Sequence, residues 1–253
     1  MAPTRSIEDA PEPMRQELID LVFALAEQNP RGITEERMHR IISQSLGVLP
    51  SGQPYGGYRR AAGREMGRAE WTRVYDLVCR LWPEFKHADL TGPFREGVNR
   101  IFAAYGVAWD LGEDGHVQRV LPPAALAQVH AALAELRDVR YAPALELFNA
   151  AKDAYDDRPR RDRDSCANIF DAMESVAKAK YQFPNATFGQ AVARLRSQGG
   201  MNDQILGVLE SINTLRNKNF GHGMADPFNL TPAAVDFTYL TCIGGILLLA
   251  RTP

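Results

Sequence analysis

Apolar residues recur at intervals of three and four positions along most of this 253-residue chain. Residues 14–28 carry such a stripe, and another follows Thr34, a residue type that favours the N-cap of a helix. This spacing places apolar side chains on one face of an α-helix. Further segments of this kind cover residues 59–82 (one helix or two), 93–106, 124–157 (with a break or kink near Pro143), 166–182, 187–197, 204–220 and 231–250. Thr231 as N-cap and Pro232 as the first helical residue open the last of these helices. The pattern therefore predicts a mainly α fold.

One segment departs from helical spacing. Residues 107–120, VAWDLGEDGHVQRV, predict two short strands around an Asp114-Gly115 turn, which is a strong local hairpin signal. A helix followed directly by a hairpin is the order of the recognition helix and wing in a winged-helix domain. Many other small α+β domains have the same order of elements. Pro122-Pro123 then marks a domain boundary. We expect a flexible tail over 1–13, an N-terminal helical domain carrying one β-hairpin over 14–122, and an up-and-down helical bundle over 123–253.

Composition and charge narrow the class of protein only moderately. The apolar content is 45% and the formal net charge is -2, which argues neither for nor against a nucleic-acid partner. The three cysteines lack CxxC spacing, which argues against a disulfide framework or a structural zinc site, and each is expected to be a small buried hydrophobe. The N-terminus lacks an apolar secretory segment. The most apolar run, 237–250, is shorter than the roughly 20 residues that span a bilayer. We therefore expect a cytoplasmic protein without a membrane partner.

The stretch NTLRNKNFGHGMADP, residues 213–227, contains the strongest candidate for chemistry. On an unbroken helix Arg216 and His222 would lie about 240° apart. Gly221 and Gly223 permit the helix to end between them, with Asn219 or Gly221 as a left-handed C-cap, so that the imidazole can return over Arg216.

Such a pair can cleave RNA. An imidazole near neutral pKa can take the proton of a ribose 2'-hydroxyl or give one to the leaving oxygen, and a guanidinium can hold the phosphate. Asn217 can orient either group. Attack by the 2'-oxygen would need no metal and no cofactor, and would give a 2',3'-cyclic phosphate. The structural alternative is that Arg216 complements the helix dipole and His222 closes a turn.

The segment LRNKNFGHG, leading into a final apolar helix, resembles the R-x(4–6)-H motif of HEPN domains. Arg-Asn followed by His-Gly is similar in particular to the C-terminal domain of abortive-infection proteins, and the helix FDAMESVAKAKY resembles that family's pattern. The resemblance covers about residues 124–251 and is looser for the N-terminal half.

The resemblance implies a four- to five-helix domain that forms a homodimer, in which two motifs face each other in one ribonuclease cleft. Arg216 and His222 correspond to the catalytic pair and Asn217 to the polar residue after the Arg. The protein would then be a toxin or phage-defence effector cleaving tRNA, mRNA or rRNA, restrained or triggered by a partner protein or ligand. The alternative is a non-catalytic HEPN-like module that binds nucleic acid or a partner.

Other polar residues are candidates for RNA binding. Glu174 and Lys178 lie four apart on one helix face, as an exposed ion pair or as a wall of the cleft with Lys178 on phosphate. The segment RPRRDRD, with Arg160 and Arg161, is either a solvated linker or a lip of that cleft.

Three further arginines form a stripe. Arg60, Arg64 and Arg68 recur every four residues and are flanked by Tyr58 and Trp71, so they form either a solvated helix face or a track for a nucleic-acid backbone. The remaining histidines show no metal-ligand spacing and are expected to be exposed or half-buried. There is no P-loop and no dinucleotide-binding motif.

Overall fold

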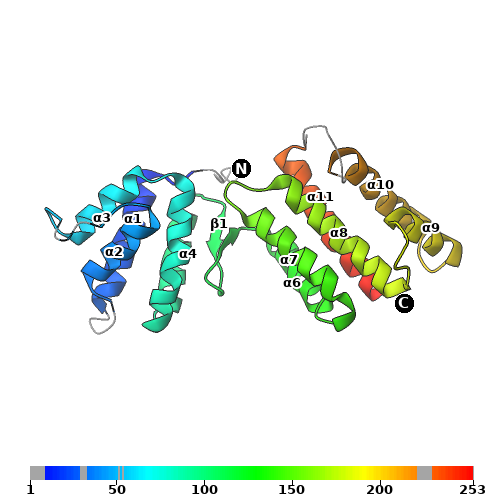
Figure 1. Ribbon diagram of the computed structural model, residues 1–253, viewed down its shortest axis with the longest axis horizontal. Coiled ribbons are helices and arrows are strands. Elements are labelled where there is room, and N and C mark those ends of the chain that lie inside the picture. Colours follow the sequence, from blue (N-terminus) through cyan, green and yellow to red (C-terminus); the bar gives the residue numbers. More distant parts are fainter. Residues whose placement is uncertain (1–8, 29–32, 51, 53, 221–229, 253) are drawn as a thin grey trace. The chain divides into compact units, whose positions relative to one another are not determined.

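The computed structural model describes residues 9–28, 33–50, 52, 54–220 and 230–252 (Figure 1). Within these ranges the chain forms eleven α-helices, one 3-10 helix and one two-stranded sheet, so the expected mainly α fold with a single hairpin is confirmed. The chain divides into two compact units, residues 1–120 and 121–253. The boundary between them lies two residues before the one that the sequence placed between Pro122 and Pro123.

The N-terminal unit contains five helices and the hairpin. Helix α1 packs against α2, α3 and α5, and the hairpin packs against α4 and α5. The elements are α1 (Glu12–Gln28), α2 (Glu35–Ser45), α3 (Tyr58–Arg68), α4 (Trp71–His87), α5 (Thr91–Ala104), β1 (Trp109–Leu111) and β2 (Val117–Arg119).

The hairpin forms where the sequence expected it. Strands β1 and β2 are antiparallel, with Asp110 opposite Gln118. Gly115 in the turn has φ +83°, and a Cβ atom at this position would also collide with the Trp82 ring. Both the left-handed backbone and the close approach therefore require glycine.

Two local expectations for this unit are corrected, concerning the tail and His39, and one alternative that the sequence left open is settled. The tail is shorter than 1–13, because α1 already begins at Glu12, Ala10 is buried, and the Asp9 carbonyl accepts a 2.7 Å hydrogen bond from Tyr75. Residues 59–82 belong to two helices that separate at 69–70. His39, expected at or near the surface, is buried, with Nε2 3.1 Å from Glu65. A neighbouring polar side chain satisfies this imidazole, so its burial is tolerated.

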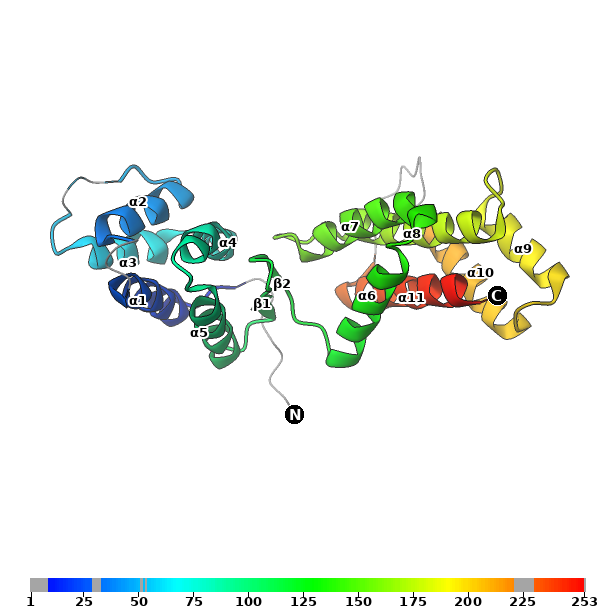
Figure 2. The ribbon, with the colours of Figure 1, turned by 90° about the horizontal axis from the view of Figure 1, so that it is seen from below.

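The C-terminal unit is a bundle of helices around α8. Figure 2 shows α7, α8 and α11 side by side, and α8 also contacts α9 and α10. The elements are α6 (Pro123–Glu135), the 3-10 helix η1 (Val139–Tyr141), α7 (Ala142–Asp156), α8 (Asp162–Tyr181), α9 (Phe188–Gln198), α10 (Asp203–Asn219) and α11 (Pro232–Arg251). The segment 124–157 breaks into separate helices, and Pro143 lies in the first turn of α7. Proline is tolerated there because the first turn of a helix does not use its backbone N–H groups for hydrogen bonds within the helix.

Helix α11 is longer than its most apolar run suggested. Thr231 caps it and Pro232 opens it, as the sequence predicted. Its length and composition satisfy those of a membrane span, and its most apolar 18-residue window has a mean hydropathy of 1.8, but half of that window is buried within the unit. Val235, Ile243 and Leu249 are fully buried in the core, which is the pattern of a central bundle helix.

Candidate functional site

A pocket of about 590 Å³ lies in the C-terminal unit, lined mainly by α8 and α10. Glu174 and Lys178 line it from α8, and Arg216 and Asn217 from α10. The other lining residues are Leu147, Asp171, Ser175, Thr187, Phe188 and Asn213. Four of the residues singled out in the sequence, from segments about forty positions apart, thus share one pocket.

The end of α10 sets the position of Arg216. This residue lies in the last helical turn, and its carbonyl accepts a 3.0 Å hydrogen bond from Phe220. Asn219 ends the helix and Phe220 is the C-cap with φ -143°, so Asn219, one of the two residues expected as a left-handed cap, does not take that conformation. Gly221 and His222 lie outside the described residues.

The Arg216 guanidinium is held on two sides. Its Nη2 lies 3.4 Å from Asp171 Oδ1, and its centre is 5.4 Å from the Phe170 ring centroid. The side chain of Arg216 is 19% exposed and that of Asp171 23%. The distance is long for a charge-assisted hydrogen bond. The contact therefore orients the guanidinium while leaving part of it accessible from the pocket.

Lys178 and Glu174 form an ion pair on α8. Lys178 Nζ lies 2.9 Å from Glu174 Oε1, and the two side chains are 34% and 17% exposed. The pair is therefore half-buried and not exposed as one alternative expected, and both residues line the pocket, while binding of phosphate by Lys178 stays a prediction. Both lie on the pocket, but the ammonium is shared with a carboxylate of its own helix.

The N-terminus of α9 also faces this pocket, through Thr187 and Phe188. Thr187 accepts a hydrogen bond from the Gln190 N–H, and the Gln190 side chain accepts one from the Thr187 N–H, which forms a capping box. The positive end of the helix dipole favours an anion in this region. Among the described lining residues, Arg216 and Lys178 are balanced by Asp171 and Glu174, so this part of the pocket carries no net formal charge.

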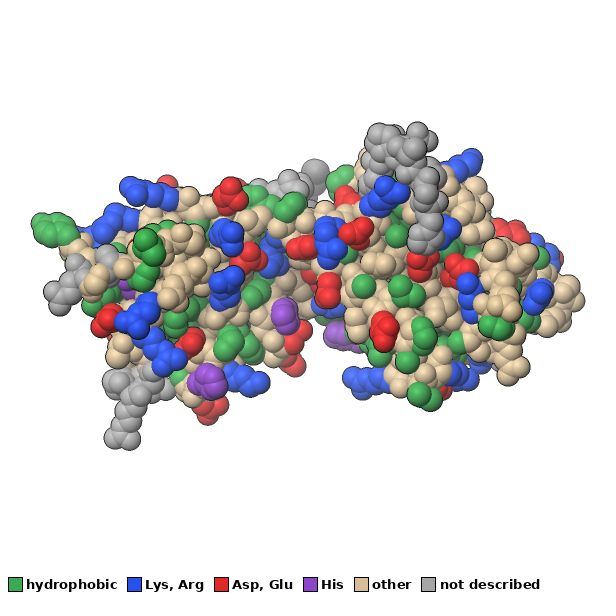
Figure 3. All heavy atoms as spheres, in the orientation of Figure 1, with side chains coloured by type: hydrophobic (Ala, Val, Ile, Leu, Met, Phe, Trp, Pro, Cys, Tyr) green, Lys and Arg blue, Asp and Glu red, His purple; other side chains and the backbone are tan. Residues whose placement is uncertain are grey.

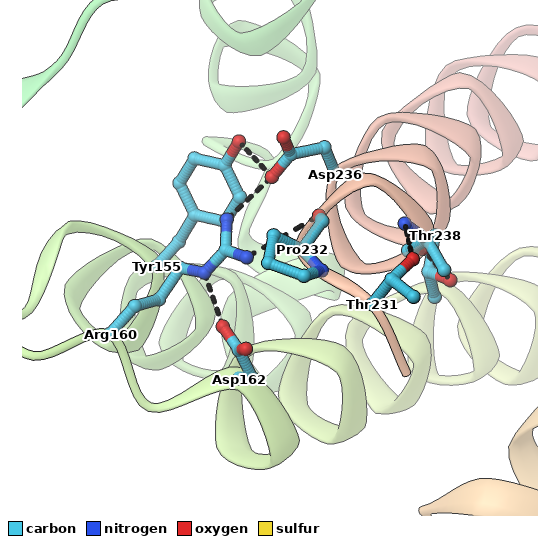
Figure 4. A network of polar contacts seen from close by, with 8 residues as sticks. Tyr155, Arg160, Asp162, Thr231, Pro232, Asp236 and Thr238 are labelled. Carbon is cyan, nitrogen blue, oxygen red and sulfur yellow. Dashed lines mark hydrogen bonds and ion pairs between the residues drawn. The ribbon is translucent and has the colours of Figure 1, made fainter. Parts of the chain in front are cut away.

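Arg160 and Arg161 are engaged elsewhere, as Figure 4 shows for Arg160. The side chain of Arg160 is 7% exposed, lies over Tyr155, and donates hydrogen bonds to Asp162 and, at 2.5 Å, to Asp236. Burial disfavours its charge, but the two carboxylates outweigh this effect and raise the pKa of Arg160 above its usual value. Arg160 therefore connects the segment between α7 and α8 to helix α11 through its ion pair with Asp236.

Arg161 is exposed and pairs with Asp157 at 2.7 Å and with Asp164 at 3.0 Å. Neither Arg160 nor Arg161 lines the pocket at Arg216. Arg60, Arg64 and Arg68 lie together in the N-terminal unit, where they line a different groove.

Asp171 is the pocket residue that the sequence interpretation missed. It precedes Glu174 by three positions and Lys178 by seven, so all three share one face of a helix. That spacing was available in the sequence. The pairing with Arg216 was not, because it depends on how α10 packs against α8.

Comparison of the chain with protein-family models, with curated proteins and with solved structures found no match. Within the described parts of the chain, no group of three or more His, Cys, Asp and Glu residues is placed to hold a metal ion.

Proposed function

We propose that this protein is a metal-independent endoribonuclease of HEPN type, acting as a cytoplasmic toxin or abortive-infection effector. The observation that supports the proposal is the shared pocket of Arg216, Asn217, Glu174 and Lys178 at the end of α10. His222 follows that end by three positions. Two residues that carry the motif resemblance, Arg216 and Asn217, therefore line a hollow together with a second cation, Lys178.

In this proposal the 2'-hydroxyl of RNA attacks the adjacent phosphate and expels the 5'-oxygen, leaving a 2',3'-cyclic phosphate. His222 moves the protons as general acid or base. Arg216 binds the phosphate and stabilises the charge that develops in the transition state. Asn217 positions one of these groups, and Lys178 binds a neighbouring phosphate.

A homodimer belongs to the proposal because the HEPN domains that the motif resembles build one cleft from two copies. Two cations and two carboxylates in one chain attract a polyanion only weakly. A second copy facing the first would add a second Arg216 and a second Lys178 as phosphate ligands, although its carboxylates leave the net formal charge of the lining residues unchanged. An apolar groove on the same unit, with exposed Ile205, Val208 and Phe237, offers a surface that association could cover.

One observation favours the alternative, a non-catalytic module that binds nucleic acid or a regulatory partner. Arg216 already has an intrachain carboxylate partner, Asp171. If this pair is permanent, the guanidinium stabilises the contact between α8 and α10 and is not available to a phosphate.

The test is cleavage of mixed tRNA, mRNA and rRNA in EDTA by folded wild-type protein, His222→Ala and Arg216→Lys. His130→Ala, at an exposed position of α6, controls for loss of a histidine. Arg194→Lys controls for loss of a guanidinium over an aromatic ring, because Arg194 lies 4.8 Å from the Phe183 centroid and does not line the pocket.

We expect wild type and both controls to produce cyclic-phosphate ends, and the two motif variants to lose at least a hundredfold in rate. Equal cleavage by wild type and His222→Ala would refute the assignment of His222. Absence of cleavage by wild type, together with weaker RNA binding by Arg216→Lys, would favour the binding module.

A further inference from the structure

The N-terminal unit contains a basic groove of about 760 Å³ along α3. Arg60, Arg64 and Arg68 line it, and all three side chains are exposed. Figure 3 shows Lys and Arg side chains gathered over the part of the surface that α3 forms. The other lining residues are Glu12, Gln16, Gly56, Arg59, Gly63 and Gly67.

The charges in this groove are unbalanced, unlike those of the pocket at Arg216. Within the described residues, Arg60, Arg64 and Arg68 form no ion pair, whereas Arg59 is paired with Asp20 at 2.9 Å. Among the described residues that line the groove, Glu12 is the single carboxylate. Three arginines without a carboxylate partner therefore face one acid, which leaves a positive groove.

The spacing of these arginines suits a chain of phosphates. Residues four apart on a helix are separated by about 6 Å along its axis and by about 40° around it. The stripe therefore follows the helix axis with a slow twist. Exposed guanidinium groups in such a row can each bind one phosphate of a nucleic-acid strand.

Two glycines of α3 line the groove. Gly63 and Gly67 also lie four apart and both line it, although glycine inside a helix lowers its stability. A Cβ atom at Gly63 would lie 2.8 Å from the terminal oxygen of the exposed Gln16 side chain, which can move aside. A Cβ atom at Gly67 would meet nothing within 4 Å. Packing thus gives no reason for glycine at position 67, whereas close approach of a ligand to the backbone does.

An exposed aromatic residue directly precedes one of the lining residues in the chain. Tyr55 is 96% exposed and directly precedes Gly56, against which the Arg60 side chain lies. The aromatic residues expected to flank the stripe are less available: Tyr58 is half-buried beside His39, and Trp71 is half-buried beside Tyr75. An exposed ring beside a basic groove is the combination that binds an unpaired base and its phosphates.

We infer that the α3 groove binds single-stranded RNA through its phosphate backbone, with Tyr55 stacking on a base. This site is separate from the pocket at Arg216, and its existence does not depend on cleavage there. It would give the N-terminal unit a role in holding an RNA strand.

The test measures binding of a fluorescently labelled 20-nucleotide single-stranded RNA to the full chain. A His222→Ala background prevents the proposed cleavage. The combined variant Arg60→Gln/Arg64→Gln/Arg68→Gln is compared with Arg73→Gln/Arg80→Gln/Arg100→Gln, which removes the same charge from exposed positions on α4 and α5.

We expect the α3 variant to bind at least tenfold more weakly, and its salt dependence of log K to be shallower by about 2, because three phosphate contacts are lost. The charge-matched control should bind within about threefold of the parent. Equal loss in both variants would show that only net charge matters and would overturn the inference.

Two further arms separate RNA from other polyanions. Tyr55→Ala should weaken RNA binding by about tenfold and leave inorganic polyphosphate binding unchanged, because polyphosphate has no bases. Gly67→Ala should weaken RNA binding without lowering the melting temperature. If polyphosphate or poly-glutamate competes as well as RNA and Tyr55→Ala has no effect, the groove is a general polyanion site and the inference of an RNA site is wrong.

Discussion

Arg216 of α10 donates a 3.4 Å hydrogen bond to Asp171 of α8, and both residues line the pocket of the C-terminal unit. Asp171 therefore has two opposed effects in the proposed nuclease. It orients the guanidinium, and it also competes with phosphate for it. If orientation is the stronger effect, Arg216 is available to bind phosphate. If competition is stronger, Arg216 mainly stabilises the contact between α8 and α10.

Asp171→Asn should raise RNA affinity. The substitution keeps the shape of the side chain but removes one negative charge beside Arg216, which we expect to strengthen binding by about 1 kcal/mol, or roughly fivefold. The measurement is RNA binding in the His222→Ala background. Asp203→Asn, which removes the same charge at an exposed site that does not line the pocket, should change affinity by less than about twofold. Lower affinity in Asp171→Asn would instead mean that orientation by Asp171 dominates.

Lys178→Met should weaken RNA binding and reduce the salt dependence of log K by about 0.7, the value expected for one lost contact to single-stranded phosphate. Lys180→Met is the control, because Lys180 lies on the same helix but contacts the Ala250 carbonyl at 3.4 Å. An unchanged salt slope in Lys178→Met would restrict Lys178 to its ion pair with Glu174.

Arg160→Met should destabilise the C-terminal unit by about 3 kcal/mol, since it leaves Asp162 and Asp236 without their mostly buried partner. Arg161→Met removes an exposed arginine from the same segment and should cost less than about 1 kcal/mol. Chemical denaturation of both variants gives the comparison. RNA affinity should be measured for the same two variants, because the sequence offered Arg160 and Arg161 as a lip of the RNA cleft. Weaker RNA binding by a folded Arg160→Met or Arg161→Met variant would support that role.

Gly245→Ala should destabilise the protein by about 1–3 kcal/mol, because a Cβ atom on this face of α11 would collide with Met173 Sδ. The neighbouring Gly244→Ala is the matched control. Nothing lies within 4 Å of a Cβ atom there, so we expect a gain of about 0.5–1 kcal/mol from helix propensity. Thermal unfolding of the two variants distinguishes them. Equal effects would contradict the packing of α11 against α8.

Cys166 should resist thiol reagents in the folded protein. Burial raises the pKa of its thiol to about 12, so at pH 8 almost no reactive thiolate is present. Because the folded-state pKa lies above the unfolded value, the contribution of Cys166 to stability is complete below about pH 8.5 and is lost as the pH rises toward 12. Mass-spectrometric mapping at pH 8 should find half-buried Cys79 labelled before Cys166 and Cys242. Early labelling of Cys166 would indicate that the bundle opens locally.

Much of the local structure was determined by the sequence alone. Helical spacing located the helices, Asp114-Gly115 located the hairpin, and Thr34 and Thr231 are the N-caps that the residue types predicted. These features depend on residues a few positions apart, whose backbone preferences and hydrogen bonds act locally. The same spacing placed Glu174 and Lys178 on one helix face.

Only the tertiary structure decided which charged side chains have partners. It paired Arg216 with Asp171 and brought α8 and α10 to one pocket. It also tied Arg160 to Asp236, seventy-six positions away, while Arg60, Arg64 and Arg68 formed no ion pair within the described residues. In the sequence all these arginines are equivalent. Their partners depend on which helix faces pack together, because a carboxylate distant in the chain neutralises an arginine only after packing brings the two within a few ångströms.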